Sequence, residues 1–177
     1  ALSYNNLIDA DAALACVRHW SEEQACCAII KHCTPCGVAL GDTLLQAYNK
    51  ALSCDPVSAF GGIVALNQTI DTPLATALKQ QFVEVLIAPG ITPEAQTILA
   101  QKKNLRILIC DTAATNSATQ LRSIDGGILS QAADSSQLRL EDCQVVTKVA
   151  PTEGQRQDLW FAWQVVQEVK SNAIVYA

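Results

Sequence analysis

The sequence contains no methionine, only two histidines and few aromatic residues, which make up 5% of its 177 positions. No run of about 18 apolar residues occurs, so no membrane-spanning helix is expected. Acidic residues outnumber basic ones, 17 to 12, and the net charge of -5 argues against binding to nucleic acid or to a membrane surface. The first residues lack the basic-then-apolar pattern of a secretion signal, so we expect a cytoplasmic protein.

What the sequence does contain is typical of one globular domain. Half of its residues are hydrophobic and 16% are charged, which is not the composition of a disordered chain. No internal repeat or low-complexity segment is present, and the length corresponds to about one domain. Because an initiating methionine is absent, we expect the sequence to be a piece of a longer protein or to have been processed.

Cysteine is abundant, with eight residues. Several lie inside apolar runs, among them Cys26, Cys27 and Cys110, and they do not follow the spacing of a disulfide-rich secreted protein. Free cysteine behaves as a small buried hydrophobic residue, and reduced thiols are the rule in the cytosol. We therefore expect reduced, mostly structural cysteines.

Segments with helical and strand-like patterns alternate along the chain. This alternation predicts an α/β fold built on a mixed, mostly parallel sheet. Helices are predicted over residues 9–20, 43–53, 72–81, 92–102 and 152–169, and strands over residues 25–30, 63–66, 85–88, 105–109, 127–131, 145–149 and 174–176. A loop is predicted over residues 111–123, and a second loop or a short helix over residues 132–142. Because ligands usually bind beyond the carboxyl ends of strands in such sheets, the loops at residues 31–37 and 88–90 are the first candidates for a site.

Lys31 and His32 follow the apolar strand predicted over residues 25–30. Imidazole has an ordinary pKa of about 6.5, so His32 can act as a base near neutral pH. A neighbouring ammonium favours the neutral base and can stabilise negative charge that develops on an acyl oxygen. The alternative is a pair of strand-end residues that contact only backbone carbonyls or water.

Cys33 and Cys36 form a C-x-x-C sequence with Pro35 between them, in a predicted turn over residues 35–37. A redox site would need a thiolate of lowered pKa, and a zinc site would need further ligands in tetrahedral geometry. The zinc-deaminase pattern H-x-E is not matched, because Thr34 stands where the glutamate would be. Packing or turn formation is the simpler interpretation of these cysteines.

Two further segments could contact a ligand. Residues 55–62 form a turn-rich stretch that contains Phe60 and ends in Gly61-Gly62, where backbone can approach a ligand closely or simply turn into a strand. Asn172, after a predicted helix, could bind a planar amide or cap that helix. Lys102, Lys103 and Arg106 form a small basic cluster that is most simply a solvated helix end.

Taken in order, several segments resemble one enzyme family over nearly the whole chain. These segments are residues 2–6, 31–37, 55–62, 82–90, 103–106, 146–153 and 170–177. The family is that of the bifunctional purine-biosynthesis enzymes, whose formyltransferase part is joined to an IMP cyclohydrolase. The chain is similar to the first lobe of that formyltransferase part, so the cyclohydrolase domain and the second lobe would lie outside residues 1–177.

The resemblance implies a fold, a reaction and partners. The fold would be a three-layer lobe similar to cytidine deaminase but without its zinc. The reaction would transfer the formyl group of 10-formyltetrahydrofolate, the cosubstrate, to the 5-amine of aminoimidazole carboxamide ribonucleotide (AICAR). The full-length protein would be a homodimer with sites at the subunit interface, and this piece alone would be inactive.

The resemblance also implies roles for individual residues. His32 would be the general base, and Lys31 would assist at the transferred formyl group. Asn172 would contact the carboxamide, and Gly61 beside Phe60 would lie against the nucleotide. Glu84 stands where the family has an acidic residue that binds the same substrate.

This chain departs from the usual family segment Lys-His-Ala-Asn-Pro-Cys-Gly, because Cys33 and Thr34 replace Ala-Asn. A direct amide contact at that point is therefore not expected to be kept. Two alternatives to the enzyme hypothesis stay open at this stage. One is a cytosolic thiol-redox or zinc-binding domain that uses Cys33 and Cys36, and the other is a noncatalytic binding domain of the same fold.

Overall fold

The computed structural model describes residues 1–112, 119–134 and 138–177. It is an α/β structure whose central sheet has five strands in the order β2-β1-β3-β4-β5. The elements, in chain order, are α1 (Tyr4–Val17), β1 (Ala25–Lys31), β2 (Thr34–Gly41), α2 (Leu44–Cys54), β3 (Gly62–Leu66), α3 (Thr72–Gln80), β4 (Val83–Ala88), α4 (Pro93–Leu99), β5 (Arg106–Ile109), β6 (Thr119–Ile124), β7 (Gly127–Ala132), a 3₁₀ turn (Leu140–Asp142) and α5 (Glu153–Val166).

The central sheet contains both parallel and antiparallel strand pairs. β1 is antiparallel to both of its neighbours, β2 and β3, while β3, β4 and β5 are parallel to one another. Four strands therefore share one direction and β1 alone runs the opposite way. The α/β class with a mixed, mostly parallel sheet is confirmed.

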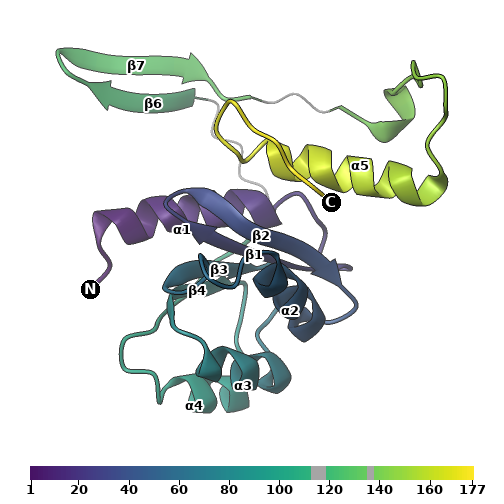
Figure 1. Ribbon diagram of the computed structural model, residues 1–177. Coiled ribbons are helices and arrows are strands. Elements are labelled where there is room, and N and C mark those ends of the chain that lie inside the picture. Colours follow the sequence, from purple (N-terminus) through teal and green to yellow (C-terminus); the bar gives the residue numbers. More distant parts are fainter. Residues whose placement is uncertain (113–118, 135–137) are drawn as a thin grey trace.

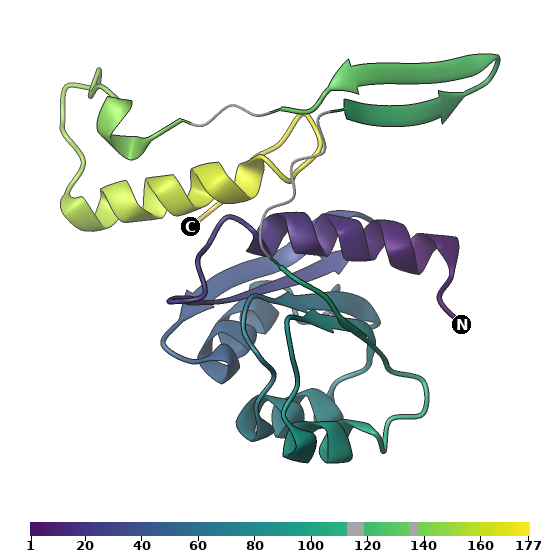
Figure 2. The ribbon, with the colours of Figure 1, turned by 180° about the vertical axis from the view of Figure 1, so that it is seen from behind.

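Helices cover both faces of this sheet (Figures 1 and 2). On one face α1 packs Ala10, Ala13 and Val17 against apolar side chains of β1, β3 and β4. On the other face α2, α3 and α4 enclose a second core. α5 lies on the α1 side, where Phe161 packs against Trp20 with ring centroids 5.4 Å apart. None of the helices in the described part of the chain is long and apolar enough to cross a membrane.

Side-chain caps set the beginnings of the helices. Thr43, Thr92 and Thr152 each accept a hydrogen bond from a backbone N–H of the first turn of α2, α4 and α5. The start of α1 was predicted wrongly at Asp9. The helix begins at Tyr4 because Ser3 and Asn6 form a reciprocal capping box.

The chain beyond β5 differs most from the prediction. β6 lies partly within the predicted loop 111–123, and it pairs with β7 in a hairpin that stands away from the sheet (Figure 1). Residues 113–118 and 135–137 of the two predicted loops lie outside the described residues. The strands predicted over 145–149 and 174–176 are irregular, since exposed segments with no neighbouring strand cannot complete their backbone hydrogen bonds as a sheet.

Candidate functional site

The tight turn between β1 and β2 places the two central candidates. Lys31 is the last residue of β1, and His32 and Cys33 connect it to Thr34, the first residue of β2. His32 and Cys33 have φ angles of 53° and 59°, in the left-handed region that two-residue hairpin turns require. Residues with a Cβ rarely adopt it, so this turn must be held by its surroundings.

The prediction of a turn at residues 35–37 is therefore wrong. Pro35, Cys36 and Gly37 lie in β2, the edge strand of the sheet. Pro35 pairs with Ile30 and Gly37 with Ile29, so Cys36 is an extra residue that forms a bulge. Edge strands and bulges are the positions where a strand tolerates proline, which explains why the segment does not turn.

Lys31 reaches across to the loop that precedes β3. Its Nζ donates a hydrogen bond of 2.6 Å to the carbonyl oxygen of Phe60. An ammonium has three donors, so this contact fixes the direction of the side chain and leaves two donors for a ligand. The end of β1 and the loop at Phe60 therefore form one surface.

Gly61 continues this surface with a backbone that favours glycine. Its φ is 71°, and its N–H donates to the carbonyl oxygen of Phe82 at 2.9 Å. A Cβ at Gly61 would lie 3.2 Å from the Phe82 ring and 4.0 Å from Oε1 of Glu84. The rings of Phe60 and Phe82 are 5.1 Å apart and both side chains are exposed, so they offer a platform on which a planar ring could stack.

Glu84, in β4, is held by a residue far away in the sequence. The Nδ2 of Asn6, in α1, donates to Oε2 of Glu84 at 3.0 Å. Asn6 is buried, so it has no freedom to turn away. Asn6 belongs to the N-terminal segment that carries the family resemblance. Its contact with Glu84 could not be predicted from the sequence, because the two residues are 78 positions apart.

Asn172 belongs to the exposed segment after α5. Its neighbour Lys170 acts on the Cys33 thiol: burial, together with the hydrogen bond to Asp9, raises the pKa of Cys33, and the Lys170 ammonium partly opposes this shift. The structure does not place Asn172 itself against His32 or Glu84.

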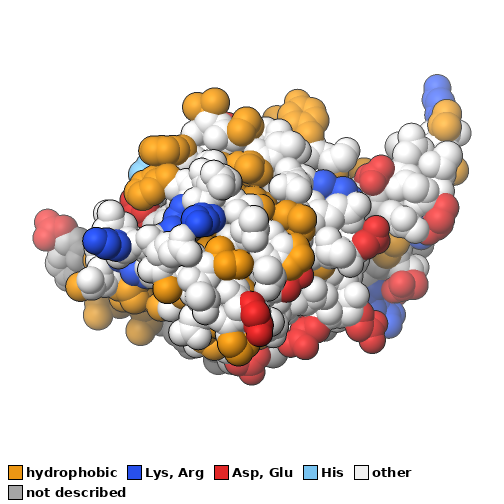
Figure 3. All heavy atoms as spheres, turned by 90° about the horizontal axis from the view of Figure 1, so that it is seen from below, with side chains coloured by type: hydrophobic (Ala, Val, Ile, Leu, Met, Phe, Trp, Pro, Cys, Tyr) orange, Lys and Arg blue, Asp and Glu red, His pale blue; other side chains and the backbone are white. Residues whose placement is uncertain are grey.

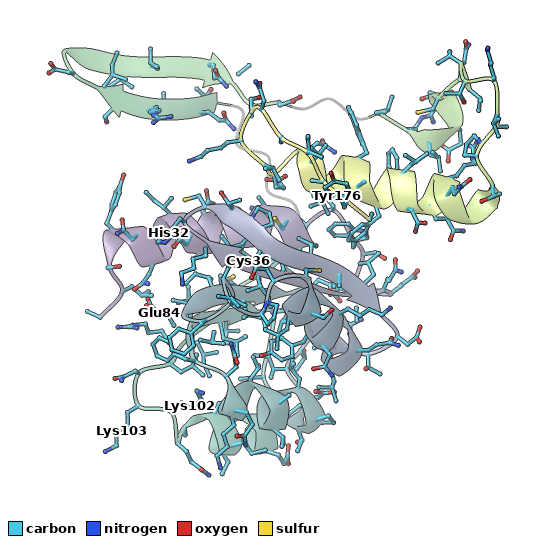
Figure 4. The ribbon with its side chains drawn as sticks, in the orientation of Figure 1. His32, Cys36, Glu84, Lys102, Lys103 and Tyr176 are labelled. Carbon is cyan, nitrogen blue, oxygen red and sulfur yellow. The ribbon has the colours of Figure 1, made fainter. Side chains whose placement is uncertain are left out.

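The candidate residues meet at one edge of the sheet. Because β1 is antiparallel to β3 and β4, the carboxyl end of β1 lies beside the amino ends of β3 and β4. His32 and Glu84 accordingly lie at the same end of the molecule (Figure 4). The loop at residues 88–90, the other candidate, follows the opposite end of β4 and therefore lies apart from these residues.

Charge is unevenly spread around this end of the molecule. From below, most acidic side chains lie on the right of the view, while Lys and Arg side chains occur on both sides (Figure 3). Lys102 and Lys103 lie beneath Glu84 (Figure 4).

Cys33 and Cys36 do not have the features of a redox pair. All the cysteines are free, and burial raises the pKa of both thiols, which Asp9 reinforces at Cys33 and Asp55 at Cys36. A nucleophilic cysteine needs the opposite shift. Across residues 1–112, 119–134 and 138–177, no three His, Cys, Asp or Glu side chains are grouped so that they could hold a metal ion.

A separate hollow of about 1000 Å³ lies between α5 and the segments on either side of it. Apolar side chains dominate its lining, including Val146, Leu159, Trp163 and Tyr176. These four are at least 43% exposed, so this hollow is an open groove. Tyr176 lies well away from His32 and Glu84 (Figure 4), and the groove is not part of the candidate site.

Comparison with known proteins shows which family the chain belongs to. A family model described as AICARFT/IMPCHase bienzyme matches residues 1–177. The chain belongs to the AICARFT/IMPCHase bienzyme family. The bifunctional purine biosynthesis protein PurH of Ruegeria sp. (strain TM1040) is 52% identical over 178 residues, which cover 99% of this chain and 34% of that protein. The chain thus spans about a third of the length of this relative, and the family resemblance inferred from the motifs is confirmed.

Proposed function

We propose that residues 1–177 are the first lobe of the AICAR formyltransferase part of a bifunctional purine-biosynthesis enzyme. In that enzyme the formyl group of 10-formyltetrahydrofolate would pass to the 5-amine of AICAR. The observation that carries the proposal is the gathering of the Lys31–His32 turn, the Phe60–Gly61 loop and Glu84 at one edge of the sheet. Family membership over the whole chain supports it.

The chemistry of the transfer matches these side chains. The amine nitrogen attacks the formyl carbon, and the carbonyl oxygen becomes an oxyanion that a donor of Lys31 can stabilise. His32 removes a proton from the amine, which is a weak nucleophile because it is conjugated with the ring and the carboxamide. The bond between the formyl carbon and N10 of the folate then breaks, and N10 takes up the proton.

The remaining residues would bind the nucleotide. The Phe60 and Phe82 rings can stack on the imidazole of AICAR while Gly61 allows close approach. Glu84, oriented by Asn6, can accept hydrogen bonds from the amine or the carboxamide. We assign Asn172 to the carboxamide by its place in the family motif, since an amide offers both a donor and an acceptor.

We also propose that the full-length protein is a cytoplasmic homodimer and that the second lobe completes the site. Exposed apolar residues support a covering partner, because a groove lined by Val146, Leu159, Trp163 and Tyr176 is costly to leave in water. The β6–β7 hairpin adds exposed Leu121 and Ile128, and two strands alone are only marginally stable in water.

Formyl transfer by the isolated 177 residues and by the full-length protein tests this division of the site. We expect turnover of AICAR with 10-formyltetrahydrofolate by the full-length protein and none by the isolated chain. Wild-type rates from the isolated chain would contradict the proposed half site. Failure of the full-length protein to turn over this substrate pair would contradict the proposed reaction.

Metal analysis of the same proteins, with a Cys36→Ser variant, tests the thiol or zinc alternative. Cys36 lies in the bulge of β2 and takes no part in the proposed transfer. We therefore expect Cys36→Ser to keep its activity and no stoichiometric metal to be present. Loss of a bound metal or of a redox couple in Cys36→Ser would favour the alternative.

A further inference from the structure

The β1–β2 turn is tied to α1 by one carboxylate. Oδ1 of Asp9 accepts a hydrogen bond from the backbone N–H of Cys33 at 2.8 Å and another from its thiol at 3.3 Å. These bonds join residues 24 positions apart in the sequence and reach the second residue of the turn. They directly constrain the backbone next to His32.

This turn needs such a constraint more than an ordinary hairpin does. His32 and Cys33 both carry a Cβ and both have positive φ, which costs free energy that glycine or asparagine would largely avoid. The hydroxyl of Thr34 approaches the carbonyl oxygen of His32 only at 3.5 Å, a weak contact. A strained backbone conformation persists only where its surroundings determine it, and here the Asp9 carboxylate is the strong contact.

The helix that carries Asp9 is itself firmly placed. Ala10 and Ala13 are buried against the sheet, and Asn6 holds Glu84. Asn6 and Asp9 are three positions apart, so they project from the same side of α1. One helix therefore fixes the carboxylate of Glu84 with one residue and the turn of His32 with another.

We propose that Asp9 is a positioning residue for the imidazole of His32. Asp9 holds the turn in its left-handed conformation and so sets the place of the base relative to Lys31 and Glu84. The inference rests on the proposed function, in which His32 is the general base. Asp9 does not touch the substrate in this role, and its effect passes through the backbone of Cys33.

Five single variants of the full-length protein test this role in the formyl-transfer assay, with thermal unfolding measured for each. Asp9→Ala removes both hydrogen bonds to Cys33. Asp9→Asn keeps an oxygen acceptor and loses the charge. Cys33→Ala keeps the backbone N–H and loses only the thiol bond, and Asp11→Ala removes an exposed carboxylate from the same helix. Asp9→Ser is too short to reach the N–H of Cys33 and serves if Asp9→Ala folds poorly.

A misplaced base lowers kcat more than it changes KM. We expect Asp9→Ala or Asp9→Ser to lower kcat roughly ten- to a hundredfold, the cost of about 1 Å of misplacement, with KM within about twofold of wild type. Asp9→Asn should recover most of the kcat, and Cys33→Ala and Asp11→Ala should match wild type. Wild-type kcat in folded Asp9→Ala or Asp9→Ser would overturn the positioning role, as would a loss in Asp9→Asn as large as that in Asp9→Ala.

A His32→Ala variant separates this inference from the function on which it rests. Wild-type turnover in His32→Ala would overturn the proposed base and the positioning role with it. An inactive His32→Ala beside a fully active Asp9→Ala would overturn only the role of Asp9.

Discussion

Among the glycines, Gly37 is the one at which an added Cβ would meet the closest neighbour. A Cβ there would collide with the carbonyl oxygen of Ala51 and lie 2.9 Å from the Cβ of Cys54, both in α2. The glycine lets α2 lie directly on β2, immediately behind the bulge at Cys36. Backbone atoms cannot move aside as a flexible side chain can, so the site depends on this small residue.

Gly37→Ala should therefore lower the free energy of unfolding by roughly 1–3 kcal/mol, the usual cost of overpacking. Gly154→Ala is the matched control, because a Cβ at Gly154 meets nothing within 4 Å. Because Gly154 lies in the first turn of α5, that change should leave the stability unchanged or raise it by up to about 1 kcal/mol. Urea denaturation of the three proteins measures the difference, and equal stabilities would contradict the close contact between α2 and β2.

The sequence motifs identified Lys31, His32, Gly61 and Glu84, and the structure brings these residues to one edge of the sheet. What the motifs could not reveal is how each residue is held. The contacts of Asp9 with Cys33 and of Asn6 with Glu84 span 24 and 78 residues. Such contacts depend on where α1 packs, and no local pattern records that.

Among the elements, α3 and α4 are joined by a lysine that the sequence suggested was merely solvated. Nζ of Lys102 donates to the carbonyl oxygens of Leu78, Lys79 and Gln81, at 3.2, 2.9 and 2.5 Å, at the carboxyl end of α3. The last carbonyls of a helix lack the usual donor one turn further on, although that of Leu78 also accepts from the N–H of Gln81 at 3.3 Å. A positive charge there also interacts favourably with the helix dipole.

Lys102→Met should consequently lower the free energy of unfolding by about 1–2 kcal/mol, because three carbonyls lose a charged donor. Lys103→Met makes the same substitution at the exposed neighbouring lysine and should change the free energy of unfolding little. Thermal or urea unfolding of the pair gives the comparison. If both variants lose the same stability, or neither loses any, Lys102 does not cap α3.

Local signals predicted the elements well where a cap or a buried run defined them. The capping box at Thr152 and the buried strands over 25–30 and 63–66 were confirmed, because their stabilising contacts are short-range or purely apolar. Prediction failed over residues 145–149 and 174–176, where apolar composition alone suggested strands. Whether such a segment forms a strand depends on a neighbour, which composition does not supply.

At the scale of the whole molecule, the direction of β1 decides where a site can form. The alternation of helices and strands indicated a sheet, but it could not show that β1 runs against the other four strands. That reversal brings the end of β1 next to the beginnings of β3 and β4. It is also why the residues at 88–90 lie apart from the candidate site.

The folded protein should become less stable at alkaline pH, because burial keeps its cysteine thiols protonated in the folded state. Burial, with a smaller effect of Glu168, raises the pKa of Cys16 from 9.0 to about 12, and burial raises that of Cys26 well above 9.0. Above pH 9 the unfolded chain releases these protons while the folded chain keeps them, so rising pH favours unfolding.

The free energy of unfolding should accordingly fall as the pH rises from 9 to about 11. The decrease should be smaller in Cys16→Ala and unchanged in a variant of the exposed Cys54, Cys54→Ala. Urea denaturation across this pH range measures the slopes. Identical slopes for wild type and Cys16→Ala would show that the buried thiol does not contribute.

The most direct measurement of the proposed function is kcat for formyl transfer by the full-length protein with and without His32. If His32 is the general base, His32→Ala should lower kcat roughly 10²- to 10⁴-fold while the protein stays folded and still binds AICAR. Unchanged kcat in His32→Ala would contradict the catalytic assignment and favour a noncatalytic domain of the same fold.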